Sequence, residues 1–391
     1  MKQVKKIVYV TSTRLPTEKA HGLATIKICE AFVGNGCEVE IIAPSLWRKD
    51  KGDIFKYYDI KDNFKIVKIP CIDLIPIKVF EKVAFILQSI SFSFFLIPYI
   101  ILKYKNDIKN IIFFSHDYIP LYFMTFLSNK VFYDIHHFPG DNFIYKRVME
   151  KSFGFSSQTK WKTKALSDKF FINPKKIVYW PNGTDVNKFR VGISREMAKI
   201  ELGIPPDKKI VMYTGQLFNW KGVDSLIKSV KILPRDFLIY IVGGARSDVD
   251  NYKNSIMEAS NERVIFVPFQ PHHKIPLWLK AADVLVLPNT GKQKVSLHYT
   301  SPMKLFEYMA SGTPIVATRI PSIEEIVNEE EVFFAEPDNP DSLAKQIQTA
   351  VTSGEIATKK GEKAMEVVSS YTWLARAKKI EDHITSLLPT T

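Results

Sequence analysis

The strongest constraint on the fold of this chain is a repeated alternation of apolar, strand-like runs with helical segments. The run KKIVYVTS (5–12) is followed by an amphipathic stretch, LATIKICEAFVGNG (23–36), and then by a second apolar run, EVEIIAP (38–44). Strand–helix–strand units of this kind form parallel sheets with helices on both faces. Further strand-like runs follow at FKIVKIP (64–70), NIIFFSH (110–116) and KVFYDIHH (130–137).

The same alternation starts again after a hinge-like connection, KKIVYWPNGTDVNKFR (175–190), which contains a Pro-Asn-Gly turn. The later strand-like runs are KIVMYTG (209–215), FLIYIVGG (237–244), RVIFVPF (263–269), DVLVLP (283–288) and PIVAT (314–318). A chain of 391 residues also exceeds one ordinary core. The sequence therefore predicts two doubly wound, Rossmann-like α/β domains facing a cleft. Their expected bounds are 1–188 and 189–372, with a C-terminal helix at 373–391 that crosses back to the first domain.

Composition and residue spacing exclude several classes of site. The hydrophobic share of 46% with 24% charged residues is typical of a globular protein. Three cysteines without paired spacing argue against a disulfide scaffold and favour a reducing, cytoplasmic compartment. The adjacent histidine pairs at 136–137 and 272–273 have no third ligand at a useful spacing. We therefore expect no metal site.

The positive charge lies in the first half of the chain. Residues 1–190 carry 30 Lys and Arg against 17 Asp and Glu, whereas residues 191–391 carry 24 of each. This asymmetry points to an anionic partner, either nucleic acid, anionic lipid or a phosphorylated substrate, unless it is compositional drift. Because the basic clusters have few interleaved aromatic residues, nucleic acid is not expected.

Residues 83–102, VAFILQSISFSFFLIPYIIL, contain no charge and are long enough to span a membrane. However, strand-like runs flank this segment on both sides, and a membrane span would prevent them from sharing a sheet. We therefore expect a buried or membrane-surface helix, flanked by Lys78, Lys82, Lys103 and Lys105 as interfacial anchors. This favours a protein held peripherally at the cytoplasmic face of a membrane with an anionic surface.

Residues 300–318, TSPMKLFEYMASGTPIVAT, place a carboxylate in a helix that otherwise has a packing pattern. Thr300 or Ser301 is expected to cap this helix. A helix N-terminus presents free amides and a partial positive charge, which favour a phosphate. Glu307, about 8 Å further along the axis, could then accept hydrogen bonds from two ribose hydroxyls. The alternative is a solvated Glu307 paired with Lys304.

A second stretch, YTGQLFNWKGVDSLIKSV (213–230), leads from a strand through a glycine turn to Lys221, directly before a helix. A lysine on such a loop could provide a point charge for a pyrophosphate. The alternative is an ordinary surface lysine.

Together with WPNGTD (180–185), FLIYIVGG (237–244) and AADVLVLPN (281–289), these two stretches resemble the retaining glycosyltransferases of the GT-B fold, group 1 or family 4 type. The resemblance covers most of the second half and extends more weakly over the first, through VTSTRLPTEKAHG (10–22) and FYDIHHFP (132–139). It implies that the C-terminal domain binds a UDP- or GDP-linked sugar and the N-terminal domain binds the acceptor. It implies no cofactor and no metal.

The resemblance also implies roles for individual residues. Lys221 would hold the donor diphosphate, Glu307 would bind the ribose, and His136 would lie against the donor sugar near the reacting carbon. His21 and Gly22 would face a phosphate or the acceptor. The other substrate-binding residues that it implies are Gly215, Gln216, Phe269, Gln270, Tyr299, Thr300, Ser301, Pro302, Met303 and Lys304. Among these, Phe269 and Gln270 would lie near the base.

Two positions depart from the pattern of that family. Gln216 stands where the family usually has an arginine, which removes one charge from the diphosphate site. Tyr299 stands where the family commonly has a glutamate that contacts the sugar.

The sequence therefore predicts a retaining transfer of a sugar to an acceptor hydroxyl, with a lipid-linked or cell-surface glycan as the acceptor. The alternatives are a nucleotide-sugar epimerase of the same fold and a non-catalytic, nucleotide-sugar-binding protein that docks on a membrane.

Overall fold

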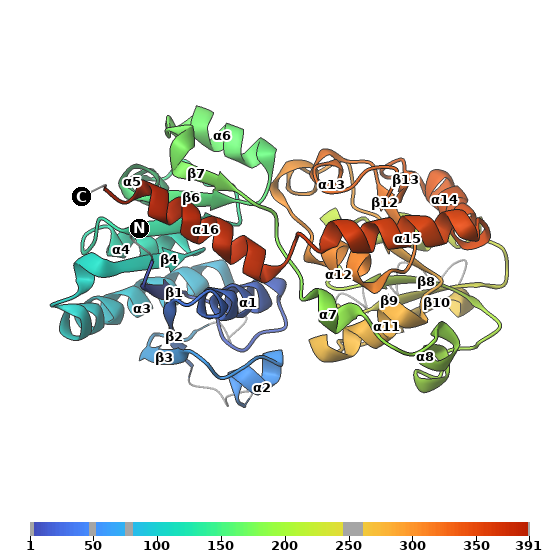
Figure 1. The fold of residues 1–391 in the computed structure, drawn as a ribbon, viewed down its shortest axis with the longest axis horizontal. Coiled ribbons are helices and arrows are strands. Elements are labelled where there is room, and N and C mark those ends of the chain that lie inside the picture. The colour runs from blue at the N-terminus through green and yellow to red at the C-terminus, as the bar shows by residue number, and fades with distance from the viewer. Residues whose placement is uncertain (1–3, 47–51, 75–80, 245–260, 390–391) are drawn as a thin grey trace. The chain divides into compact units, whose positions relative to one another are not determined.

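The computed structural model describes residues 4–46, 52–74, 81–244 and 261–389 (Figure 1). The chain divides into two compact units, each built on its own sheet. The N-terminal unit comprises Met1–Trp180 and Trp373–Thr391, and the C-terminal unit comprises Pro181–Thr372.

The described strands of the N-terminal unit form a seven-stranded parallel sheet in the order β3-β2-β1-β4-β5-β6-β7. These strands are β1 (Lys6–Val10), β2 (Glu38–Ser45), β3 (Lys65–Pro70), β4 (Ile111–Ser115), β5 (Val131–Ile135), β6 (Gly154–Ser157) and β7 (Ile177–Tyr179). Its helices are α1 (Ala20–Gly34), α2 (Ile54–Tyr58), α3 (Glu81–Tyr104), α4 (Tyr118–Met124), α5 (Phe143–Lys151), α6 (Lys160–Phe170) and α16 (Trp373–Leu387). The strand order reverses between β1 and β4, and such a switch point opens a crevice at the carboxyl ends of the strands.

The C-terminal helix α16 belongs to the N-terminal unit, where it packs against α1 (Figure 1). Asn35, just after α1, donates from Nδ2 to the backbone oxygen of Leu374 at 3.3 Å and to Glu381 Oε1 at 3.2 Å. A Cβ at Gly34 would lie 2.7 Å from the side chain of Leu374, so this glycine allows the two helices to approach closely.

The described strands of the C-terminal unit form a six-stranded parallel sheet in the order β10-β9-β8-β11-β12-β13. These strands are β8 (Lys209–Thr214), β9 (Phe237–Val242), β10 (Val264–Val267), β11 (Val284–Leu287), β12 (Ile315–Thr318) and β13 (Phe333–Ala335). Its helices are α7 (Val186–Phe189), α8 (Arg195–Glu201), α9 (Val223–Ser229), α11 (Ile275–Ala281), α12 (Met303–Ser311), α13 (Pro321–Glu324), α14 (Pro340–Thr352) and α15 (Glu355–Val368).

Alternate side chains of the strands contact helices on both faces of this second sheet. Ile210 and Met212 of β8 point into one core with α8, α11, α12 and α15, whereas Val211 and Tyr213 point into the other with α9 and α14. Because successive side chains of a strand face opposite sides, a strand that is apolar at every position is covered on both faces. The predicted doubly wound parallel architecture is confirmed for both units.

Helix α3 contains the uncharged segment, and its two faces have different surroundings. Phe92, Leu96, Ile100 and Tyr104 recur every four residues and pack into the core of the N-terminal unit. Helix α3 is long and apolar enough to cross a membrane by length and composition alone, and 33% of that stretch is buried in the protein. The strands before and after it, β3 and β4, belong to the same sheet, as the sequence predicted.

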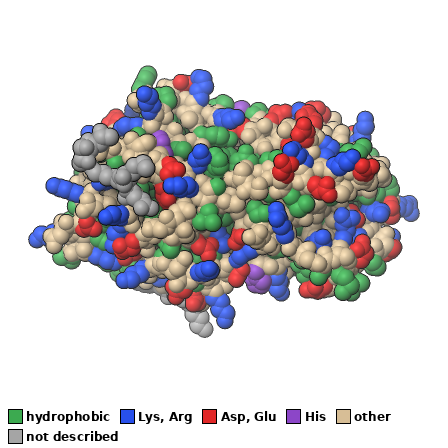
Figure 2. All heavy atoms as spheres, in the orientation of Figure 1, with side chains coloured by type: hydrophobic (Ala, Val, Ile, Leu, Met, Phe, Trp, Pro, Cys, Tyr) green, Lys and Arg blue, Asp and Glu red, His purple; other side chains and the backbone are tan. Residues whose placement is uncertain are grey.

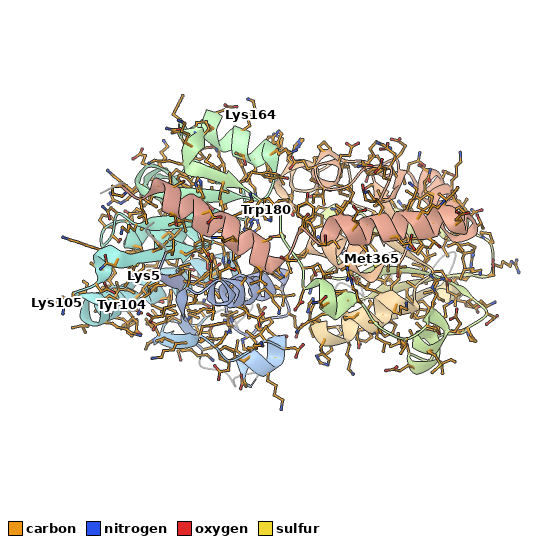
Figure 3. All side chains as sticks on the ribbon, viewed as in Figure 1. Lys5, Tyr104, Lys105, Lys164, Trp180 and Met365 are labelled. Atoms are coloured by element: carbon orange, nitrogen blue, oxygen red, sulfur yellow. The ribbon has the colours of Figure 1, made fainter. Side chains whose placement is uncertain are left out.

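Tyr104 and Lys105, which are labelled in Figure 3, mark the end of α3. Lys103 Nζ is 2.5 Å from Glu40 Oε2, and Tyr104 donates to Glu40 Oε1 at 2.8 Å, so Lys103 neutralises a buried carboxylate. Lys105 is exposed, and Lys78 lies outside the described residues. On the face drawn in Figure 2, basic side chains are interspersed with acidic and uncharged ones, without one continuous basic surface.

Candidate active site

The candidate donor site lies at the carboxyl edge of the second sheet, where glycines let backbone segments approach closely. Gly215 follows β8 and donates from its amide to the oxygen of Val242 at 2.8 Å, and Gly243 donates to the oxygen of Val267 at 2.9 Å. Both glycines have positive φ, at 114° and 111°. A Cβ at Gly243 would lie 3.1 Å from the oxygen of Gly215. Glycine at 243 therefore allows the turn after β9 to pack closely against the end of β8.

The loop after Gly215 positions Lys221. Tyr213 donates from its hydroxyl to the oxygen of Gln216 at 2.7 Å, which fixes the start of the loop. Gly222 has φ +66°, and a Cβ there would lie 1.9 Å from the oxygen of Pro288, so only glycine fits between this loop and the end of β11. The predicted placement of Lys221 directly before α9 is observed.

Lys221 is half-buried, and its Nζ lies 3.7 Å from the ring centroid of Trp220. Burial lowers the pKa of Lys221 to about 7. Among the described residues it forms no ion pair. A partly desolvated ammonium without a carboxylate has strong affinity for an incoming anion.

The helix of the TSPMKLFEYM motif, α12, begins at Met303 with Pro302 at its N-cap and no side-chain cap. The predicted cap by Thr300 or Ser301 is wrong. Instead, Ser301 accepts a hydrogen bond from the amide of Asn182 at 3.0 Å, and its backbone oxygen accepts from Asn182 Nδ2 at 2.8 Å. The first amides of α12 therefore have no side chain competing for them, as a phosphate site requires.

Glu307 is 8% exposed and contacts a histidine. Its Oε1 lies 2.9 Å from His272 Nε2, and His272 follows β10 in the short turn before α11. The alternative of a solvated glutamate paired with Lys304 is therefore wrong. The turn of α12 after Glu307 is anchored by Tyr308, whose hydroxyl accepts from the amide of Thr214 at 2.8 Å. This contact ties α12 to the carboxyl end of β8.

Lys304 is the second buried lysine of this edge. It is 8% exposed, and its Nζ lies 3.5 Å from the ring centroid of Tyr213. A Cβ at Gly215 would lie 3.2 Å from the same Nζ. Burial and the charge of Lys221 lower the pKa of Lys304 well below its usual range, against the opposing effect of Glu307.

Three other residues that the sequence assigned to the nucleotide-sugar site lie after β10 or directly before α12. Phe269 and Gln270 follow β10 and are half-buried, and Gln270 donates from Nε2 to the oxygen of Pro268 at 3.1 Å. Tyr299 ends a π-helical turn, Val295–Tyr299, directly before Thr300 and α12. Short π-helical turns occur often at functional sites.

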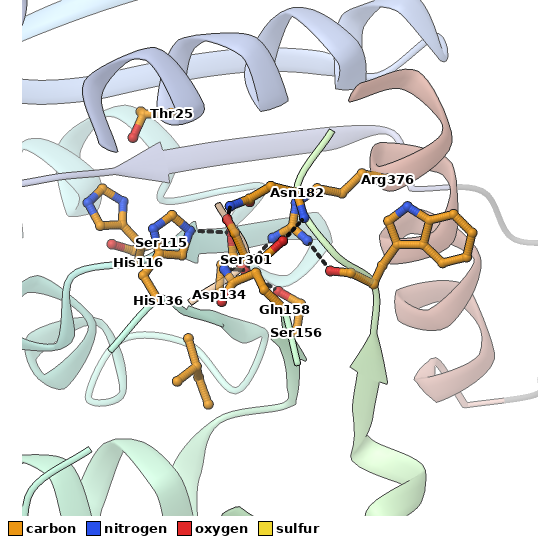
Figure 4. A network of polar contacts seen from close by, with 12 residues as sticks. Thr25, Ser115, His116, Asp134, His136, Ser156, Gln158, Asn182, Ser301 and Arg376 are labelled. Carbon is orange, nitrogen blue, oxygen red and sulfur yellow. Dashed lines mark hydrogen bonds and ion pairs between the residues drawn. The ribbon is translucent and has the colours of Figure 1, made fainter. Parts of the chain in front are cut away.

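In the N-terminal unit, His136 follows β5 and lies beside a buried carboxylate (Figure 4). His136 Nε2 is 3.0 Å from Asp134 Oδ2, and Asp134 Oδ1 accepts from Arg376 Nη2 at 2.7 Å and from Ser156 at 2.6 Å. Burial alone would raise the pKa of Asp134, but Arg376 and His136 hold it well below its usual range. Burial lowers the pKa of His136 to about 4, against the effect of Asp134.

The 3.0 Å contact with Asp134 favours one tautomer of His136. An ionised carboxylate only accepts hydrogen bonds, so this contact forms when His136 carries its proton on Nε2. Nδ1 of His136 is then an acceptor.

Two further histidines lie close to His136: His21, which the sequence predicted as a site residue, and His116, which it did not. His116, after β4, stacks on His136 with ring centroids 4.9 Å apart, and His21 lies 6.0 Å from His116. Burial and the neighbouring His116 lower the pKa of His21 to about 3. Gly22 lies in the first turn of α1, where a Cβ would be 2.3 Å from Thr17 and 2.6 Å from the Tyr58 hydroxyl. This packing gives position 22 a steric requirement for glycine.

Sequence reasoning missed three polar residues that the fold brings to these edges. His272 and His116 were not recognisable because their partners, Glu307 and His136, are distant in sequence. Asn289 follows β11 and is fully buried, and its amide nitrogen and oxygen have no hydrogen-bond partner in the part of the chain that the structure describes. A run such as VLVLPN contains no signal that its final asparagine is unsatisfied.

Two parallel-sheet α/β units, the second with cations and a helix N-terminus at the carboxyl edge of its sheet, define the GT-B fold. Sucrose-phosphate synthase from Thermosynechococcus elongatus superposes with a TM-score of 0.77 at 17% identity, covering 98% of this chain and 99% of that one. Anabaena HepE, in complex with UDP and glucose, superposes with a TM-score of 0.73 at 15% identity, covering 98% and 100%. The predicted GT-B fold is confirmed.

The family follows from the sequence of the second unit. Residues 194–367 match the family described as glycosyl transferases group 1. D-inositol 3-phosphate glycosyltransferase from Corynebacterium glutamicum (strain R) is 28% identical over 227 residues, which cover 55% of this chain and 53% of that protein. This chain spans about half the length of the curated relatives that it matches. Residues 194–367 therefore match the group 1 glycosyltransferase family, in agreement with the resemblance seen in the motifs.

Proposed function

We propose that this protein is a retaining glycosyltransferase that moves a sugar from a nucleotide-diphosphate sugar to an acceptor hydroxyl. The C-terminal unit binds the donor, and the N-terminal unit binds the acceptor. The observation that carries this proposal is a set of groups at one sheet edge. They are the half-buried Lys221, which forms no ion pair with the residues that the structure describes, the uncapped N-terminus of α12, and Glu307 one turn beyond it. The first two suit a diphosphate, and the third suits a ribose.

In the proposed reaction the acceptor oxygen attacks the anomeric carbon while the bond from that carbon to the diphosphate breaks. The acceptor proton passes to an oxygen of the leaving diphosphate on the same face, so the configuration is retained. Lys221 and the amides of α12 stabilise the charge that develops on the diphosphate. With its proton on Nε2, His136 accepts at Nδ1 a hydrogen bond from a hydroxyl of the donor sugar, which orients the sugar.

A panel of UDP- and GDP-linked sugars tests the donor assignment. We expect one nucleotide series to raise the melting temperature, because a ligand that binds only the folded state stabilises it. Because HepE has been crystallised in complex with UDP and glucose, UDP-linked sugars are the first series to test. The stabilising donor should then release its diphosphate slowly in water and faster with an acceptor. A panel in which no nucleotide sugar stabilises the protein would contradict the proposal.

Glu307→Ala is expected to weaken donor binding more than it lowers turnover. The substitution removes the carboxylate that would accept the ribose hydroxyls and leaves His272 without its partner. Hydrogen bonds to a charged group contribute roughly 1.5–3 kcal/mol, so affinity should fall roughly 10- to 100-fold. Calorimetric titration with the nucleoside diphosphate measures this loss. His272→Ala is the companion variant. Unchanged affinity in Glu307→Ala would contradict the assignment of Glu307 to the ribose.

A membrane-borne acceptor accounts for the outer face of α3. Its large apolar side chains with at least 37% exposure are Val83, Phe85, Ile86, Leu87, Ile90, Phe94, Phe95, Ile101 and Leu102. A monomeric soluble protein rarely exposes so many apolar residues on one helix, and such a surface marks an interaction site. With the basic first half of the chain, this face fits an anionic bilayer surface and hence a lipid-linked acceptor.

Phe94→Ser with Leu102→Ser is expected to lower binding to vesicles of anionic phospholipid at least about tenfold. These side chains are 69% and 82% exposed, so their loss leaves the core intact but removes about 1.5–3 kcal/mol each on insertion. Co-flotation measures the effect. Ile200→Ser, at a 62% exposed position of α8 in the other unit, is the matched control. Equal flotation of all three proteins, or none by the wild type, would refute the membrane assignment.

A further inference from the structure

Lys304 differs from the other deeply buried lysines of this protein. Lys162 Nζ donates to the oxygen of Ile135 at 2.7 Å and to Gln158 at 2.6 Å, and Lys199 Nζ is 2.8 Å from Asp283 Oδ2. Lys304 Nζ has no hydrogen-bond partner among the described residues. A buried ammonium without partners is costly, and native proteins rarely keep one without a functional reason.

Among the described residues, the surroundings of Lys304 provide no anionic partner for its enclosed Nζ. The ring of Tyr213 lies 3.5 Å from Nζ on one side, and the bare Cα of Gly215 leaves room on another. The nearest carboxylate on its helix, Glu307, is engaged by His272. Lys221 lies on the loop that begins at Gly215, the residue whose Cβ position is 3.2 Å from Lys304 Nζ, and the charge of Lys221 also lowers the pKa of Lys304.

Two ammonium groups, neither with an ion-pair partner in the described part of the chain, therefore lie near each other at the edge that carries the N-terminus of α12. Like charges held together in a partly desolvated site repel, and this cost is recovered only when an anion binds between them. One phosphate monoester would leave one ammonium poorly compensated, whereas two adjacent phosphates can compensate both.

We propose that Lys304 is the second cation of the diphosphate site, and that together with Lys221 it makes the site selective for two adjacent phosphates over one. This assignment rests on the proposed function and names its substrate class as nucleoside diphosphates and their sugar esters. Gln216 stands where the family usually has an arginine, so the loop after β8 lacks that positive charge. Lys304 supplies a positive charge from helix α12 instead.

The test compares Lys304→Met with the wild type in calorimetric titrations of UDP against UMP and of GDP against GMP. Met keeps the length of the side chain and removes its charge. A charge-assisted hydrogen bond is worth roughly 10- to 100-fold in affinity, so the preference for diphosphate over monophosphate should fall by about that factor. Binding of the monophosphate should change little.

A stability readout separates this role from a structural one. Removing a buried, unpartnered charge should leave the melting temperature unchanged or raise it, whereas a lysine that held the fold together would lower it on replacement. Lys345→Met, which removes an exposed lysine of α14, is the matched control for net charge. It should alter neither property.

The outcomes distinguish this assignment from the proposed function. A Lys304→Met protein that keeps the full preference for diphosphate overturns the role of Lys304 and leaves the glycosyltransferase proposal standing. A melting temperature that falls together with the affinity for mono- and diphosphate alike also overturns it. A wild type that binds none of the four nucleotides overturns both.

Discussion

Lys221→Ala should lower turnover by roughly 100- to 1,000-fold while the protein remains folded. Removing one fixed positive or hydrogen-bonding group aimed at a developing anion typically costs this much. The loss should appear mainly in kcat, because the charge on the leaving diphosphate is greatest in the transition state. Stability should be preserved, since the loop is fixed by Gly222 against Pro288 and by Tyr213 on Gln216, not by Lys221 itself.

Steady-state transfer from the stabilising donor and a melting curve together measure this result. Lys228→Ala removes the same charge from an exposed position of α9, and it should retain wild-type turnover. Activity of Lys221→Ala within a few-fold of the wild type would show that Lys221 does not act on the diphosphate. A large fall in the melting temperature would instead assign Lys221 to the fold.

The architecture was predictable because strand and helix periodicity are local properties of the sequence. Apolar runs such as KIVMYT and VLVL cover both faces of a parallel sheet, and the glycines and prolines that end them mark the turns. Residues 83–102 illustrate how topology resolves an ambiguous composition. Their hydropathy alone permits a membrane span, but the strands on either side pair within one sheet.

The position of Lys221 was also predictable, since a lysine followed by glycine at the start of a helix is a local pattern. The pairing of polar groups was not. The alternative to a ribose-binding Glu307 was a solvated carboxylate paired with Lys304, three residues away, yet Glu307 contacts His272, which is 35 residues away. Ser301 was expected to cap its own helix, yet it bonds Asn182 across 119 residues. Long-range contacts of this kind depend on tertiary packing, which overrides local capping preference.

The same reason explains why the unpaired state of Lys304 could not be recognised in advance. An i, i+3 glutamate suggests a surface ion pair, and only the fold shows that this glutamate is engaged elsewhere and that the lysine is enclosed. Which buried polar groups of a site lack a hydrogen-bond partner can be recognised only after all their neighbours have been placed in the fold.

Asp134→Asn should produce the largest loss of stability. Asp134 and Arg376 are both almost fully buried, with side-chain exposures of 3% and 1%, and they join β5 to α16 at 2.7 Å. Removing one partner of a buried ion pair leaves the other charge uncompensated and typically costs about 3–5 kcal/mol. Asn keeps the shape and an acceptor oxygen, so the change isolates the charge. Urea unfolding at neutral pH, followed by tryptophan fluorescence, measures the free energy lost.

Asp382→Ala is the matched control, because it also removes an acid that pairs with a basic residue of α16, Lys378, but at an exposed position. It should change stability little. The pH dependence provides a second check. Because the pKa of Asp134 is lower in the folded state than in the unfolded chain, its stabilisation is complete above the unfolded value of about 4 and is lost as the pH falls below it. The gap between Asp134→Asn and the wild type should therefore be constant from neutral pH down to about pH 5 and narrow below about pH 4. A gap as small as that of Asp382→Ala at neutral pH would show that α16 does not depend on this ion pair.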